Sequence, residues 1–117
     1  MLKKTLELCK QHNTEIILVV TPMPEVFNSL YSNLDKIYSP YYQLAEEYNA
    51  CLLDFNLKKD KSDMYSDKID FCNTTHMSGD GAVKFSYDLA DILNRMDNGE
   101  NIQKLFYGSY EQISVLQ

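Results

Sequence analysis

The sequence is poor in the residues that fix small proteins through covalent or metal frameworks. Its 117 residues include no tryptophan, three cysteines, four glycines and three prolines. An odd number of cysteines without a Cys-x-x-Cys pair favours neither a disulfide framework nor a zinc site, so we interpret them as reduced thiols. A glycine-rich phosphate loop is also missing, which argues against a flavodoxin-like regulatory domain. We therefore expect no metal and no cofactor.

Long hydrophobic runs are equally scarce. No segment approaches the roughly 20 apolar residues that span a bilayer, so we expect no membrane-spanning segment. The start of the chain carries two lysines, as a signal peptide would, but Glu7 and Lys10 interrupt the apolar run that should follow. The chain as given is therefore expected to be cytoplasmic.

Positive charge is in deficit. The chain has 11 basic and 17 acidic residues, a net charge of -6. Because no basic stripe is present to neutralise phosphates, we do not expect a nucleic acid as partner. The rest of the composition, 44% hydrophobic and 24% charged, is ordinary for a soluble globular protein. A chain of this length predicts one domain that buries roughly 65% of its unfolded surface.

Two apolar runs predict β-strands. Residues 16–20 (IILVV) are continuously apolar and mostly β-branched, which is typical of a strand covered on both faces in a parallel sheet. We predict this strand at residues 15–21 and a second one at residues 50–55. The long connection between them favours a parallel, right-handed crossover. The predicted fold class is therefore α/β.

Helical periodicity covers much of the remaining chain, at residues 1–12, 24–49 and 79–97. Pro40 predicts an interruption of the second of these helices, because proline breaks a helix interior but suits its first position. Residues 57–70 contain eight charged residues in fourteen, which predicts a solvated loop with one short helical turn. Residues 98–117 fit either a helix or a strand, and we expect them to form a tail that serves as an assembly element.

The segment FCNTTHMSGDGA, at residues 71–82, concentrates the chemistry of the chain. It holds one of the two histidines and two of the four glycines, directly before an amphipathic helix. His76 falls after the second strand, where a loop histidine can serve as a general base. Ser78 suits the N-cap of the helix. The segment therefore predicts a catalytic corner.

The same segment resembles the C-terminal signature of the SGNH (GDSL-type) hydrolases, Asp-x-x-His followed by a polar turn and Gly-Ala. The resemblance implies a partial three-layer α/β/α sandwich with a parallel, flavodoxin-like sheet, of which residues 1–97 would be the C-terminal half. It also implies hydrolysis or transfer of acyl esters of a carbohydrate or lipid type. In that family a serine is the nucleophile, a histidine is the base and an aspartate orients the histidine.

The chain departs from the family pattern in two ways. Asn73 stands where the orienting aspartate is expected, and the Gly-Asp-Ser block of the nucleophile is absent. The implied site is therefore His76 with Asn73, unless Asp70 or Asp54 replaces the aspartate. Cys72, four residues before His76, raises a Cys–His hydrolase as an alternative, although we expect this thiol to be buried and inert.

These departures predict that the isolated chain is inactive. Its partner would be an acyl-ester small molecule or a glycan if the domain is completed. The alternative is a non-catalytic α/β binding or assembly module derived from the same fold. Half of a doubly wound sheet leaves a strand edge and apolar faces uncovered, so we also expect a homo-oligomer.

Overall fold

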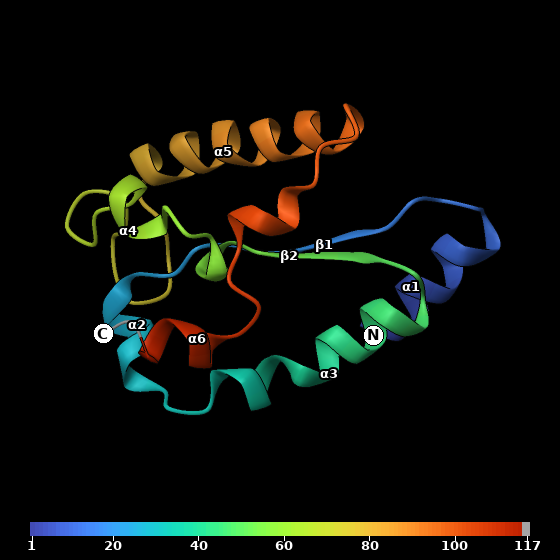
Figure 1. Ribbon diagram of the computed structural model, residues 1–117, viewed down its shortest axis with the longest axis horizontal. Helices are drawn as coiled ribbons and strands as arrows, with labels where there is room; N and C mark the ends of the chain where they lie inside the picture. Colours follow the sequence, from blue (N-terminus) through green and yellow to red (C-terminus); the bar gives the residue numbers. More distant parts are fainter. Residues whose placement is uncertain (116–117) are drawn as a thin grey trace.

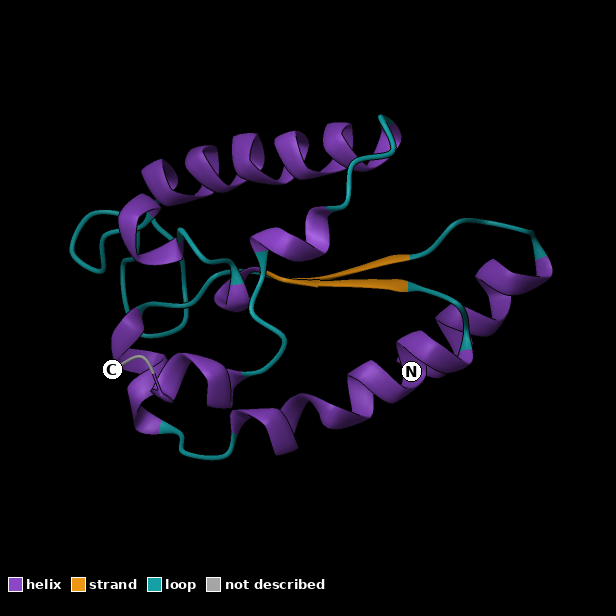
Figure 2. Cartoon of the chain, viewed as in Figure 1, coloured by secondary structure: helices purple, strands orange, loops and turns teal. Residues whose placement is uncertain are grey.

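The computed structural model describes residues 1–115, so the last two residues of the predicted tail lie outside the described part of the chain. The elements follow one another in the order α1 (Leu2–Gln11), β1 (Ile17–Val20), α2 (Glu25–Leu30), α3 (Leu34–Glu47), β2 (Cys51–Asp54), η1 (Phe55–Leu57), α4 (Lys61–Met64), α5 (Gly79–Asp97), η2 (Ile102–Leu105) and α6 (Tyr110–Val115). Figure 2 shows how helices dominate and how short the two strands are.

The two strands pair in parallel, with Ile17 opposite Cys51 and Val20 opposite Asp54. In Figure 1, α5 lies on one side of the strands and α1 and α3 lie on the other. The strands were predicted from the apolar runs and their parallel direction from the long connection between them, and the α/β class is confirmed.

The strands are not equally covered. In β2, Leu53 and Asp54 are each only 3% exposed, whereas Val19 of β1 is 37% exposed. The expectation that the first strand is covered on both faces is therefore wrong. An apolar run makes burial favourable, but coverage depends on distant elements. Here α5 builds its core on β2.

That core joins α5 to the second strand. Ile92 and Phe55 are fully buried beside Leu53, and Phe85 meets Phe55 edge-on with ring centroids 5.0 Å apart. The hydroxyl of Ser78 accepts a hydrogen bond from the Gly81 amide at 3.1 Å and caps the helix. The expected helix therefore forms with the expected cap.

The predicted break at Pro40 is wrong, because Pro40 lies inside α3 and the chain leaves the helix at residues 31–33 instead. Proline removes one backbone hydrogen bond, but contacts at the start of α3 compensate for it. Leu34 packs in a cluster with Leu57 and Tyr110. The carboxylate of Asp35 accepts the backbone amide of Tyr110 at 2.8 Å, so tertiary contacts fix where α3 begins.

The charged segment 57–70 contains one helical turn, α4, as predicted, but it is not a solvated loop. Several of its residues are buried, namely Leu57, Lys58, Lys61, Tyr65 and Asp70. The charges are paired across the fold: Lys58 Nζ lies 2.7 Å from Asp88 Oδ1, and Lys84 Nζ lies 2.8 Å from Asp70 Oδ2. Charge content alone could not distinguish solvation from pairing.

The described part of the tail packs on the body of the chain. The Tyr107 amide donates to the Leu57 carbonyl at 2.7 Å, beside an antiparallel bridge between Lys58 and Phe106. Tyr110 stacks on Tyr38 at 5.7 Å and donates its hydroxyl to the Asp54 carboxylate. The tail is thus helical at both η2 and α6, which resolves the helix-or-strand alternative up to residue 115.

Candidate functional site

The loop that carries His76 lies on the side where both strands end. In Figure 1 the yellow segment before α5 is on the same side as the carboxyl ends of β1 and β2. The loop is closed on itself, because the Cys72 amide donates to the His76 carbonyl at 3.0 Å and Phe71 forms a bridge with Met77. Its base is fixed by the Ser78 amide, which donates to the Asp70 carbonyl at 2.9 Å.

Gly81 allows α5 to begin directly against this base. A Cβ at position 81 would stand 2.0 Å from the Asp70 carbonyl oxygen, far inside van der Waals contact. Any side chain here would push the helix away from the loop. Glycine at position 81 therefore permits the close approach of the α5 backbone to the loop.

Asn73 organises the loop through its side-chain oxygen. Asn73 Oδ1 accepts the backbone amides of Thr75 and His76, both at 2.9 Å. The same oxygen lies 3.0 Å from Nδ1 of the His76 ring. Asn73 and His76 are both exposed, so the ring is open to solvent as well as held by its neighbour.

Two neighbours contact Nδ1 of the His76 ring. Two backbone N–H groups need an acceptor, so the atom of Asn73 that faces them is the amide oxygen rather than the nitrogen. A bond from Nδ1 to this oxygen requires the ring proton on Nδ1, whereas a bond from the Thr75 hydroxyl to Nδ1, also at 3.0 Å, requires the proton on Nε2. The geometry accommodates both tautomers of the neutral ring.

Neither alternative carboxylate pairs with His76. Asp70 is fully buried and accepts hydrogen bonds from Lys84 Nζ and the Ser66 amide through Oδ2. Burial acts to raise the pKa of Asp70, but these hydrogen bonds outweigh it and hold the pKa below its usual value. Asp54 is bound to Tyr110 and the Asn56 amide, and burial raises the pKa of its carboxyl. Asn73 and Thr75 are the partners that the structure gives to the His76 ring.

The nearby nucleophile candidates face elsewhere. Cys72 is exposed, which corrects the expectation of a buried thiol, and its Sγ contacts the His76 and Met77 carbonyl oxygens at 3.5 Å. Ser78 is occupied as a cap and donates its hydroxyl to the Ile69 carbonyl at 2.7 Å. In residues 1–115, the ring nitrogen contacts of His76 are with Asn73 and Thr75.

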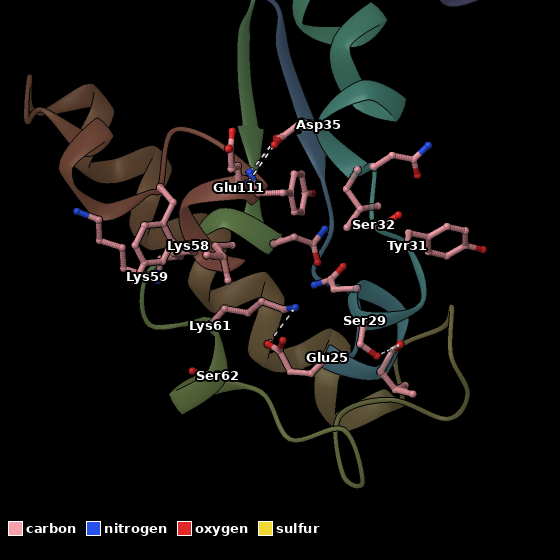
Figure 3. Close-up of a pocket in the computed structure, with 18 residues that line it drawn as sticks. Glu25, Ser29, Tyr31, Ser32, Asp35, Lys58, Lys59, Lys61, Ser62 and Glu111 are labelled. Carbon is pink, nitrogen blue, oxygen red and sulfur yellow. Dashed lines mark hydrogen bonds and ion pairs between the residues drawn. The ribbon is translucent and has the colours of Figure 1, made fainter. Parts of the chain in front are cut away.

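Sequence reasoning missed a second polar region, shown in Figure 3. A cavity of about 890 Å³ lies between α2, the start of α3, residues 56–62 and α6. No residue of the segment 71–82 lines it, so it is distinct from the histidine corner. The only sequence feature that could have indicated this cavity was the high charge content of residues 57–70, and we interpreted it as a solvated loop.

Comparisons with protein-family models, with curated proteins and with solved structures find no match to the chain. Within residues 1–115, no helix has both the length and the apolar character to cross a membrane. The same residues hold no group of three or more histidine, cysteine, aspartate or glutamate side chains that could bind a metal ion.

Proposed function

We propose that this chain is the C-terminal segment of an SGNH-type hydrolase domain that cleaves or transfers acyl esters of a carbohydrate or lipid type. His76 is its general base and Asn73 is the residue that orients the histidine. The chain supplies no serine nucleophile. In isolation it has no hydrolase activity above background.

The observation that carries the proposal is the contact at 3.0 Å between Asn73 Oδ1 and His76 Nδ1. A histidine base must be held in one orientation and one tautomer, with its other nitrogen free for the proton of the nucleophile. In this proposal the Asn73 oxygen meets that requirement by accepting the proton of Nδ1, and its two backbone donors identify it as the oxygen. What it lacks is the negative charge that stabilises an imidazolium.

The arrangement around the corner supports the SGNH-type fold. A parallel strand pair, a loop histidine on its carboxyl side and a final helix opened by Gly81 are what a partial three-layer α/β/α sandwich requires. Open α/β sheets place ligands outside the carboxyl ends of their strands. Residues 1–97 would form the C-terminal half of such a sandwich, and further parallel strands would pair beside β1.

The tautomer is directly measurable. Long-range ¹H–¹⁵N correlation spectra of the neutral protein should report His76 with the proton on Nδ1, whereas Asn73→Ala should shift the ring toward the Nε2-protonated form. Thr74→Ala is the matched control, since Thr74 is an exposed neighbour in the same loop. An Nε2-protonated ring in the wild-type protein would overturn the orienting role of Asn73.

Activity is tested with p-nitrophenyl acetate on the wild type, His76→Ala and Cys72→Ser. We expect none of the three to turn over, because the attacking group is absent and oxyanion donors are each worth about 10²–10³ in rate. Turnover beyond a single acylation that disappears in His76→Ala would contradict the proposal. Dependence on Cys72 as well would favour a Cys–His hydrolase.

The second candidate is a non-catalytic α/β binding or assembly module. Asn73 favours it, because an Asp→Asn change in a triad lowers turnover about 10⁴-fold in the best-known case. Genomic sequence upstream of Met1 distinguishes the two. The hydrolase proposal expects a Gly-Asp-Ser block within roughly one domain length, and its absence there would favour the module.

A further inference from the structure

The cavity of about 890 Å³ contains a buried cation with unused hydrogen-bonding capacity. Lys61 is 4% exposed, and its Nζ lies 3.2 Å from Glu25 Oε1. Within the described residues this ion pair is the polar contact that the structure gives to Nζ. An ammonium group has three N–H donors, so most of its capacity remains unused.

The other lysines of the cavity wall are differently placed. Lys58 is buried as well, but its Nζ contacts Asp88 at 2.7 Å and Asp60 at 2.9 Å. Lys59 is exposed and lies over the Tyr107 ring at 5.7 Å. Lys61 is therefore the buried cation of this wall that has donors to spare. Burial lowers the pKa of Lys61, and the Glu25 carboxylate counteracts that effect.

The side chain of Glu25 lies at the boundary between the cavity and solvent. This side chain is 48% exposed, so the carboxylate lies beside solvent while the Lys61 side chain is buried. Glu25 belongs to α2, a six-residue helix without a buried residue, whose first amides are held by Asp67 at 2.9 and 3.2 Å. The Glu25 carboxylate can therefore turn into solvent, whereas the Lys61 ammonium cannot.

When Glu25 turns away, the Lys61 ammonium loses the carboxylate that lies against it and keeps the longer-range attraction of Asp54 and Asp67, which is unfavourable for a buried charge. A second carboxylate that enters the cavity would remove that penalty. The structure already shows that a carboxylate fits at Nζ, because Glu25 occupies the place. Figure 3 shows Ser32 and Ser62 on the surrounding elements, and their hydroxyl groups can donate to a carboxylate, whereas the Ser29 hydroxyl already donates to the Val26 carbonyl at 2.8 Å.

We propose that this cavity binds a small organic carboxylate, whose carboxylate group replaces that of Glu25 at Lys61 Nζ. The site is separate from the histidine corner and does not depend on the proposed hydrolase function. Its ligand is recognised by one charge-assisted contact from Lys61 and by hydroxyl groups of the wall.

The test is a ¹H–¹⁵N NMR titration of the full chain with sodium succinate up to roughly 20 mM, a range that detects millimolar dissociation constants. Sodium chloride at matched ionic strength and the neutral analogue succinamide are the controls. We expect saturable shifts at the amides of Asn56, Lys61 and Ser62 with succinate only. Sodium phosphate forms a separate arm, and binding of phosphate instead of succinate would overturn the assignment to carboxylates.

Three variants separate the roles. Lys61→Met should weaken succinate binding roughly tenfold or more, as expected for a lost charge-assisted hydrogen bond. Glu25→Gln removes the competing carboxylate and should tighten binding several-fold. Lys59→Met removes the same charge from the cavity rim and should change the affinity less than about twofold, because exposed charges are screened.

Each outcome bears on the proposal. Succinate shifts that are absent, or that succinamide reproduces, would overturn it. So would wild-type affinity in Lys61→Met or weaker binding in Glu25→Gln. Glu25→Gln keeps Lys61 in place, so the proposal remains testable even if Lys61→Met fails to fold.

Discussion

The buried ion pair between Lys58 and Asp88 makes the sharpest prediction about stability. Lys58 is 7% exposed and Asp88 is 4% exposed, and their charged atoms are 2.7 Å apart. The other oxygen of Asp88 accepts the Tyr65 hydroxyl at 2.8 Å. Burial acts to lower the pKa of Lys58, but hydrogen bonds to Asp88 and Asp60 outweigh it and raise the pKa, so the cation persists. The change to make is Asp88→Ala.

The magnitude follows from what the substitution leaves behind. Breaking a buried pair by removing one partner costs about 3–5 kcal/mol, and an orphaned buried hydroxyl adds about 1–3 kcal/mol. Asp60 still contacts Lys58 at 2.9 Å and reduces the loss. Alanine also gains up to about 0.7 kcal/mol in helix propensity. We expect a net loss of about 3 kcal/mol, or about 10 °C in Tm for a domain of this size.

Asp91→Ala is the matched control, because Asp91 lies one turn along the same helix in an exposed pair with Arg95. An exposed i,i+4 pair is worth about 0.3–0.5 kcal/mol, which the propensity gain offsets, so this variant should be nearly neutral. Urea unfolding followed by far-UV circular dichroism suits a protein without tryptophan. Equal free energies of unfolding for the two variants would refute the reasoning.

A double variant identifies the source of the loss. Lys58→Met with Asp88→Leu removes both charges, and apolar replacement of a buried pair is often neutral or stabilising. We expect the double variant to recover most of the stability lost in Asp88→Ala. If it is as unstable as the sum of its single variants, the loss comes from packing rather than from an uncompensated charge.

The remaining predictions concern the base of the histidine loop and the carboxyl end of β2. Gly81→Ala should lower the free energy of unfolding by about 1–3 kcal/mol, because the added Cβ would lie 2.0 Å from the Asp70 carbonyl oxygen. Gly79→Ala is the control and should not destabilise the protein, because nothing lies within 4 Å of its Cβ position. Equal effects of the two substitutions in urea titrations would contradict this prediction. The lowered pKa of Asp70 stabilises the folded state above the usual value of 3.8 and is lost as pH falls, so the deficit of Asp70→Asn should shrink on acidification. The raised pKa of Asp54 has the opposite effect on stability, so Asp54→Asn should gain stability relative to wild type as the pH rises above 3.8. Unfolding curves between about pH 3 and 7 check the predictions for Asp70→Asn and Asp54→Asn.

The elements predicted best were those set by local chemistry. The strands at residues 15–21 and 50–55 contain β1 and β2, and their parallel direction follows from the long crossover between them. Ser78 caps α5 as expected, because an N-cap depends on residues within one turn. Asn73 lies within reach of His76 for the same reason, since three residues of a tight loop separate them.

The predictions for Pro40 and for the burial of β1 were wrong because contacts between residues far apart in the sequence determine both. Pro40 is tolerated in α3 because Leu34 packs against α6 and Asp35 binds its first amides, contacts that span 75 or more residues. Val19 is 37% exposed, although Ile17 of the same strand packs against the core of Leu53 and Ile92. No periodicity in the sequence specifies which strand a helix will cover.

The prediction of a solvated loop at residues 57–70 was wrong for a different reason. Eight charges in fourteen residues normally indicate solvent, yet Lys58 and Asp70 find their partners on α5. A single sequence gives the number of charges but not their pairing. The cavity beside Lys61 is lined by segments far apart in the sequence, so it could not be predicted either.

The segment of residues 67–70 contacts both the wall of the cavity and the base of the histidine loop. Asp67 holds the first amides of α2, which forms part of the cavity wall, and Asp70 holds the base of the loop through the Ser78 amide. These two aspartates are three residues apart, so the wall of the cavity and the base of the loop are parts of one packed unit. A substitution in this segment would therefore disturb both sites. Lys59, an exposed residue outside the segment, is for that reason a sound control for the cavity.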